Sequence, residues 1–100
     1  AYVAQLRHVN RRVLEAIDGI RANSARPAAI VVTGDHGPRS RTDWYSAERT
    51  DPAEAFRILT AVSLPDRQPG DAATIDTLSP VNVFRFLLGT RFGMKTPLLP

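Results

Sequence analysis

The sequence predicts an α/β fold: part of a mixed sheet flanked by helices, in the order helix, strand, strand, helix. Three observations predict it: an amphipathic first segment, two short strand-like segments after it, and a late segment with helical spacing. Hydrophobic residues make up 43% of the 100 residues, which is typical of a globular chain and excludes a disordered one.

The first expected helix covers the start of the chain. One apolar stripe runs along it at steps of three and four, through Tyr2, Leu6, Val9, Val13, Ile17 and Ile20. Asn23 and Ser24 weaken the helix, and Pro27 forbids its continuation because proline lacks the amide hydrogen.

Two strands are expected next. Residues 28–33 are short, apolar on both faces and rich in β-branched side chains, which is typical of a strand buried inside a sheet. Residues 56–64 alternate and predict a second strand that Pro65 ends. Between them, residues 34–38 form a sharp turn and residues 39–52 a long polar loop, with a short helical turn near residues 53–55.

A second long helix is expected after a turn-rich loop at residues 66–73. Ser79 supplies a hydroxyl N-cap and Pro80 occupies the first turn. Apolar residues follow at helical spacing, and Gly89 or Gly93 ends the helix. Asn82 and Arg85 on this helix are expected to make buried polar contacts to the sheet or its loops.

Charge and composition exclude several classes of protein. The net charge is +3, and the basic residues are scattered rather than gathered in a stripe, so we expect no nucleic-acid partner. No run reaches the roughly 18 apolar residues that span a bilayer. There is no cysteine, which excludes disulfides and thiolate metal sites. The first residue is Ala1 rather than methionine, so we expect the native start of the gene product to lie upstream.

Asp35 and His36 are the candidate metal ligands. They follow a buried strand directly, and ligands collect at the carboxyl ends of strands in α/β sheets. A carboxylate oxygen and an imidazole nitrogen suit divalent metals. Gly34 and Gly37 would allow close approach of the backbone. The competing interpretation is a turn cap in which Asp35 binds backbone amides.

Three blocks of sequence resemble the sulfatase-like alkaline phosphatase superfamily. Residues 29–37 (AIVVTGDHG) resemble its apolar strand followed by Asp-His-Gly. Residues 2–18 resemble the helix before that signature, and residues 79–85 (SPVNVFR) with Phe92-Gly93 resemble the late helix of bacterial sulfatase-like membrane proteins. The family includes sulfatases, phosphoglycerol transferases and lipoteichoic acid synthases.

This resemblance implies that residues 1–100 are the C-terminal fragment of a sulfatase-like catalytic domain. The Asp35–His36 pair would bind the catalytic divalent metal ion, which could be zinc, manganese, magnesium or calcium. The parent would hydrolyse or transfer phosphate or sulfate esters, in an extracytoplasmic domain anchored to the cell membrane. No nucleophile is found in this fragment, so the isolated chain is expected to be inactive.

Other residues leave alternatives open. Arg39 and Arg41 could grip the phosphate or sulfate of a substrate, or belong to a solvated loop. Trp44 and Tyr45 are expected to anchor the long loop onto the body of the protein. The competing functions are a degenerate, non-catalytic module of the same family and a basic adaptor that binds nucleic acid. Neither the oligomeric state nor the choice between sulfate and phosphate follows from the sequence.

Overall fold

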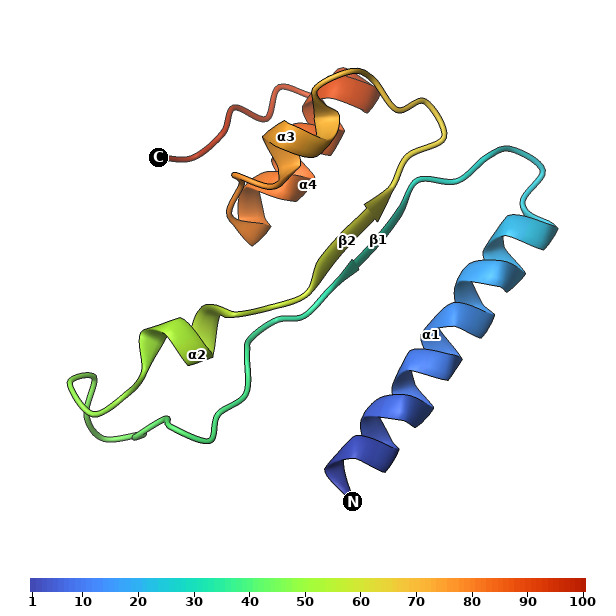
Figure 1. Ribbon diagram of the computed structural model, residues 1–100. Coiled ribbons are helices and arrows are strands. Elements are labelled where there is room, and N and C mark those ends of the chain that lie inside the picture. Colours follow the sequence, from blue (N-terminus) through green and yellow to red (C-terminus); the bar gives the residue numbers. More distant parts are fainter. The chain divides into compact units, whose positions relative to one another are not determined.

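The computed structural model describes all 100 residues, as four helices and two strands (Figure 1). In chain order these are α1 (Tyr2–Asn23), β1 (Ile30–Thr33), α2 (Pro52–Phe56), β2 (Thr60–Ser63), α3 (Asp71–Ile75) and α4 (Pro80–Phe92). The chain divides into one unit of residues 1–31 and 62–66 and a second of residues 32–61 and 67–100. Each unit is described by itself.

The predicted α/β class is wrong for this chain. Helices account for 45% of the residues, and the sheet consists only of β1 and β2, which run antiparallel. The prediction required further strands on either side of residues 28–33, and none is present. The apolar strand is therefore half-buried rather than enclosed on both faces. The order also differs, because α2 precedes β2 and α3 precedes α4.

Helix α1 confirms the first predicted helix. It ends at Asn23, whose side-chain amide donates to the carbonyl of Gly19 at 2.8 Å, and Ser24 leaves the helix with extended backbone angles. An exposed pair between Arg12 and Glu15, 2.6 Å apart, spans one turn. No residue of α1 is buried: Val13 and Ile17 of its apolar stripe are half-buried, and the rest of the stripe is exposed. None of the helices has the length and apolar character that a membrane span needs.

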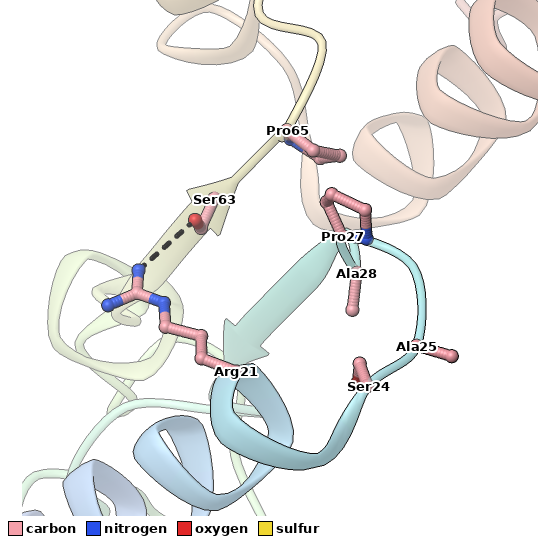
Figure 2. A pocket seen from close by; sticks show the side chains of 7 residues that line it. All are labelled: Arg21, Ser24, Ala25, Pro27, Ala28, Ser63 and Pro65. Carbon is pink, nitrogen blue, oxygen red and sulfur yellow. Dashed lines mark hydrogen bonds between the residues drawn. The ribbon is translucent and has the colours of Figure 1, made fainter.

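A hollow of about 480 Å³ lies where α1 ends and β2 ends (Figure 2). It is lined by Arg21, Ser24, Ala25, Pro27, Ala28, Ser63 and Pro65. The Arg21 guanidinium reaches the Ser63 hydroxyl at 3.4 Å. Arg21 is the only charged lining residue, and the Ser63 hydroxyl is the one polar side chain bonded to it, so this hollow does not form a chemical site.

The small core of the second unit lies on α4. Val83 and Leu87 are its buried apolar side chains, with exposed fractions of 2% and 6%. Helix α4 begins at Pro80 after Ser79 as predicted, but the Ser79 hydroxyl makes no capping hydrogen bond. Gly93 ends the helix with a φ of +64°, a value that suits glycine. Asn82 is also buried, but its amide group binds the backbone of Leu99 in the C-terminal tail, at 2.9 and 3.0 Å, rather than the sheet. Arg85 likewise donates to Pro97.

Candidate metal-ligand turn

The Asp35–His36 pair lies one residue beyond β1. The amide of Gly34 still donates to the carbonyl of Leu59 at 3.0 Å, which extends the ladder by one bond before the chain bends away. Asp35 Oδ1 accepts a hydrogen bond from the amide of His36 at 3.0 Å. One of the two Asp35 oxygens therefore caps the turn, as in the competing interpretation. Its second oxygen, Oδ2, lies 3.6 Å from Nε2 of His36.

A backbone carbonyl determines which nitrogen of the His36 imidazole carries the hydrogen. Nδ1 lies 2.8 Å from the carbonyl oxygen of Gly37. A carbonyl can only accept, so Nδ1 carries the hydrogen of this bond, and in the neutral ring Nε2 then holds a lone pair. Metal-binding histidines are oriented by this kind of bond from the nitrogen that does not bind the metal.

The separation of the two potential ligand atoms fits a shared cation. Two ligands at zinc distances in a tetrahedral arrangement lie about 3.4 Å apart. The 3.6 Å between Asp35 Oδ2 and His36 Nε2 is close to this value. The side chains are 89% and 42% exposed, so an ion can reach both. This separation is compatible with two positions of a metal site, and the role of Asp35 and His36 as metal ligands stays a prediction.

Gly37 anchors the turn against helix α2. It is buried, and its amide donates to the carbonyl of Ala55 at 2.7 Å. A Cβ atom here would overlap the carbonyl oxygen of Glu54 and lie 2.9 Å from that of Arg57. Its φ is not positive, so glycine is needed for close approach rather than for an unusual backbone conformation.

Helix α2 is held to the loop after the turn by two acidic residues. Asp51 caps the helix, accepting the amide of Glu54 at 3.2 Å, and Pro52 occupies the first turn. The Glu54 carboxylate accepts the amide of Arg41 at 2.8 Å and the hydroxyl of Ser40. Glu54 is absent from the residues predicted to be functional, although Asp51-Pro52 followed by an acidic residue is a local signal for a helix start.

The structure places the predicted substrate ligands Arg39 and Arg41 on contacts within the loop. The Arg39 guanidinium lies 4.9 Å from the centre of the Trp44 ring, a cation–π distance. Arg41 lies 3.5 Å from Asp51 and lines a hollow that also contains Arg57. Neither arginine contacts the Asp35–His36 pair, so their role toward a substrate stays a prediction.

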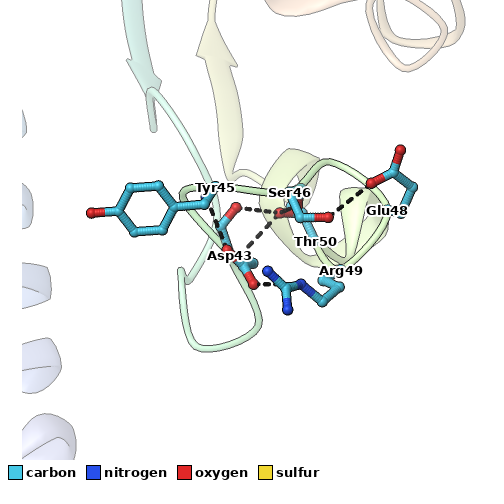
Figure 3. Close-up of polar contacts among 6 residues, drawn as sticks. All are labelled: Asp43, Tyr45, Ser46, Glu48, Arg49 and Thr50. Atoms are coloured by element: carbon cyan, nitrogen blue, oxygen red, sulfur yellow. Dashed lines mark hydrogen bonds and ion pairs between the residues drawn. The ribbon is translucent and has the colours of Figure 1, made fainter.

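A network of hydrogen bonds and one ion pair holds the loop at residues 43–50 (Figure 3). Thr50 bonds the backbone of Asp43 and Ser46, and Arg49 pairs with Asp43 at 2.8 Å. The Ser46 hydroxyl donates to Glu48 at 2.8 Å, and this bond lowers the pKa of the Glu48 carboxyl. Trp44 and Tyr45 are 69% and 96% exposed, so these polar bonds hold the loop and the expected aromatic anchor is not seen.

The remaining chemical groups near the turn are engaged elsewhere. The Thr33 hydroxyl lies 3.1 Å from that of Thr60 across the sheet. No group of three or more metal-ligating side chains is present, and the other histidine, His8, is exposed on α1. No family model, curated protein or solved structure matches the chain.

Proposed function

We propose that this chain contributes the Asp35–His36 metal-ligand pair to a metal-dependent enzyme that acts on phosphate or sulfate esters. The observation that supports the proposal is the 3.6 Å convergence of Asp35 Oδ2 and His36 Nε2, together with the bond between Nδ1 and the Gly37 carbonyl. Two acceptor atoms facing each other at this distance suit a cation between them.

The chain's own residues have separate tasks in this proposal. Asp35 supplies a hard oxygen, and His36 supplies a nitrogen whose lone pair is directed by Gly37. Asp35 and His36 would hold a divalent ion, and that ion would supply Lewis-acid chemistry that lowers the pKa of a nucleophile and neutralises charge on the ester oxygens. Arg39 and Arg41 are the candidates for contacting the ester anion, which requires them to leave their present partners.

The rest of the site lies outside these residues in this proposal. Zinc takes about four ligands, and a catalytic site keeps one position open, so at least one more protein ligand and the nucleophile are needed. We propose that they belong to a longer chain of the sulfatase-like type, anchored to the cell membrane with its catalytic domain outside. The 100-residue chain alone is then expected to leave aryl phosphates and aryl sulfates intact.

Manganese titration of the isotope-labelled chain tests the pair directly. Two ligands bind weakly, and the paramagnetism of Mn²⁺ reveals weak binding because it broadens nearby NMR signals. We expect the signals of Asp35 and His36 to broaden at a lower Mn²⁺ concentration than those of His8, which is the internal control. Replacement of either residue, as Asp35→Ala or His36→Ala, should remove the difference.

Equal broadening at both histidines, or selective broadening that survives Asp35→Ala, would contradict the metal site. The alternative function, a degenerate module without catalysis, predicts a different result in the longer chain. An enzyme loses ester hydrolysis on Asp35→Ala while keeping its fold, whereas a degenerate module has no hydrolysis to lose.

A further inference from the structure

We propose that Glu54 is a positioning residue for the Asp35–His36 pair: it fixes helix α2 so that the Gly37 carbonyl selects the imidazole tautomer. This inference rests on the proposed function for its purpose, but its geometry stands on the described contacts alone. Glu54 lies 18 positions beyond His36 and touches neither ligand. It acts through the backbone that holds them.

The first step is the grip of Glu54 on the loop. Its two carboxylate oxygens accept from different groups, Oε1 from the Ser40 hydroxyl and Oε2 from the Arg41 amide at 2.8 Å. Hydrogen bonds to an ionised carboxylate are stronger than those between neutral groups. A backbone bond from the Asp51 amide to the Arg41 carbonyl, at 3.0 Å, reinforces the same junction. Glu54 thus holds α2 beside residues 40 and 41.

The second step is the fit of Gly37 into this junction. Its amide reaches the Ala55 carbonyl at 2.7 Å, and the Glu54 carbonyl occupies the space where a side chain would begin. The same residue therefore contacts the turn through its backbone and the following loop through its side chain. Gly37 is buried and precedes Pro38, and both features limit the directions that its own carbonyl can take.

The third step links that direction to the ligand nitrogen. The Gly37 carbonyl receives Nδ1–H of His36 and leaves Nε2 without a proton in the neutral ring. An unrestrained neutral histidine prefers the opposite tautomer, with its proton on Nε2. If α2 separates from the loop, His36 returns to that preference, and the nitrogen that faces Asp35 Oδ2 loses its lone pair to a proton.

The experiment compares Glu54→Ala with the matched control Glu48→Ala in the full 100-residue chain without metal. Glu48 lies in the same loop, but its carboxylate bonds only the Ser46 hydroxyl and its own backbone. The ¹⁵N shifts of the His36 ring report the tautomer directly, and a merely structural bond elsewhere would not change them. We expect the Nδ1–H tautomer in the unmodified chain and in Glu48→Ala, and a majority of Nε2–H in Glu54→Ala.

Exchange of the Gly37 amide gives a second readout. Loss of the two Glu54 bonds should accelerate it about twenty-fivefold, since each net hydrogen bond changes an opening equilibrium by about a factor of five. Glu54→Gln keeps one acceptor oxygen, so its Gly37 exchange rate should lie between those of the unmodified chain and Glu54→Ala. It also serves if the alanine variant unfolds the chain.

Several results would overturn the proposal: an Nε2–H tautomer in the unmodified chain, or unchanged His36 shifts and Gly37 exchange in both Glu54 variants. Mn²⁺ titration separates the two claims. A tautomer that depends on Glu54 in a chain without selective Mn²⁺ broadening would retain the positioning role and reject the metal function. Selective broadening, together with a tautomer that does not change in the Glu54 variants, would retain the metal function and reject the positioning role.

Discussion

Gly37 shows how an absent side chain determines where the candidate ligands lie. Its backbone touches α2 on one side and accepts from the His36 ring on the other. The sequence predicts that glycines beside Asp35 and His36 permit close approach, and the structure confirms close approach at Gly37, with α2 as the neighbour. The sequence could not name that neighbour, because α2 begins 15 positions later.

The same substitution should therefore have opposite effects at two glycines. Gly37→Ala should lower the free energy of unfolding by about 1–3 kcal/mol, because the new methyl group meets backbone that no rotamer change can move. Gly19→Ala, inside α1 with open space around it, should raise it by about 0.5–1 kcal/mol. Urea unfolding of the two variants measures both, and a neutral Gly37→Ala would show that the turn is not held against α2.

The pKa of the Glu48 carboxyl offers a test of the hydrogen-bond network at residues 43–50. The Ser46 hydroxyl, followed by the residue's own backbone, lowers the pKa of Glu48 by favouring the charged form. A lowered pKa in the folded state stabilises the protein above the ordinary glutamate pKa, and this contribution is lost as the pH falls through the folded value. NMR titration should show the pKa rising on Ser46→Ala and unchanged on Ser40→Ala. An equal pKa in all three chains would mean that the bond does not persist.

At the scale of elements, helices α3 and α4 are joined by an ion pair with little access to water. The Asp71 and Arg91 side chains are 8% and 12% exposed, and Asp71 Oδ2 also accepts the amide of Gln68 at 2.7 Å. Gly70, with a φ of +90°, makes the bend that begins α3. The pair contrasts with Arg12 and Glu15 on α1, whose side chains are 68% and 51% exposed.

Removing one charge from each pair should give very different results. Asp71→Asn keeps the shape and the acceptor for Gln68 but leaves Arg91 opposite a neutral group, which should cost about 3–5 kcal/mol. Glu15→Gln on the exposed pair should cost less than about 0.5 kcal/mol. Urea midpoints at unchanged m-values measure the difference. Similar small losses in both variants would show that water reaches Asp71.

The length of an element decides how far the sequence predicts it. Helices α1 and α4 carry several turns of apolar spacing, and each ends shortly before a residue that breaks helices, Pro27 for α1 and Gly93 for α4, so local sequence suffices. Helices α2 and α3 have five residues each, too few for a periodic pattern. The expected strand at residues 56–64 shrinks to Thr60–Ser63, because Phe56 completes α2 and alternation alone does not mark where pairing begins.

At the scale of the whole molecule, many more apolar residues fall on the apolar faces of helices and strands than are buried. Only Val83 and Leu87 are buried apolar residues, whereas the stripe of α1 and much of the strand pair remain accessible. The mixed-sheet prediction required a strand paired on each side of the apolar segment 28–33. Whether such partner strands exist depends on the rest of the fold and not on the segment itself. The Asp35–His36 pair was predictable because both residues and their glycines are adjacent in sequence.

This uneven burial should appear as uneven protection from hydrogen exchange. Helix α1 depends mostly on local helix stability, since none of its residues is buried, and we expect its amides to exchange within about tenfold of unprotected rates. Amides near Val83 and Leu87 in α4 should exchange about a hundredfold more slowly than those of α1. Gly19→Ala should slow exchange in α1 and leave α4 unchanged. Protection of α1 equal to that of α4 would mean that its stripe is covered in solution, and repeating the measurement at several protein concentrations would show whether a second copy provides the cover.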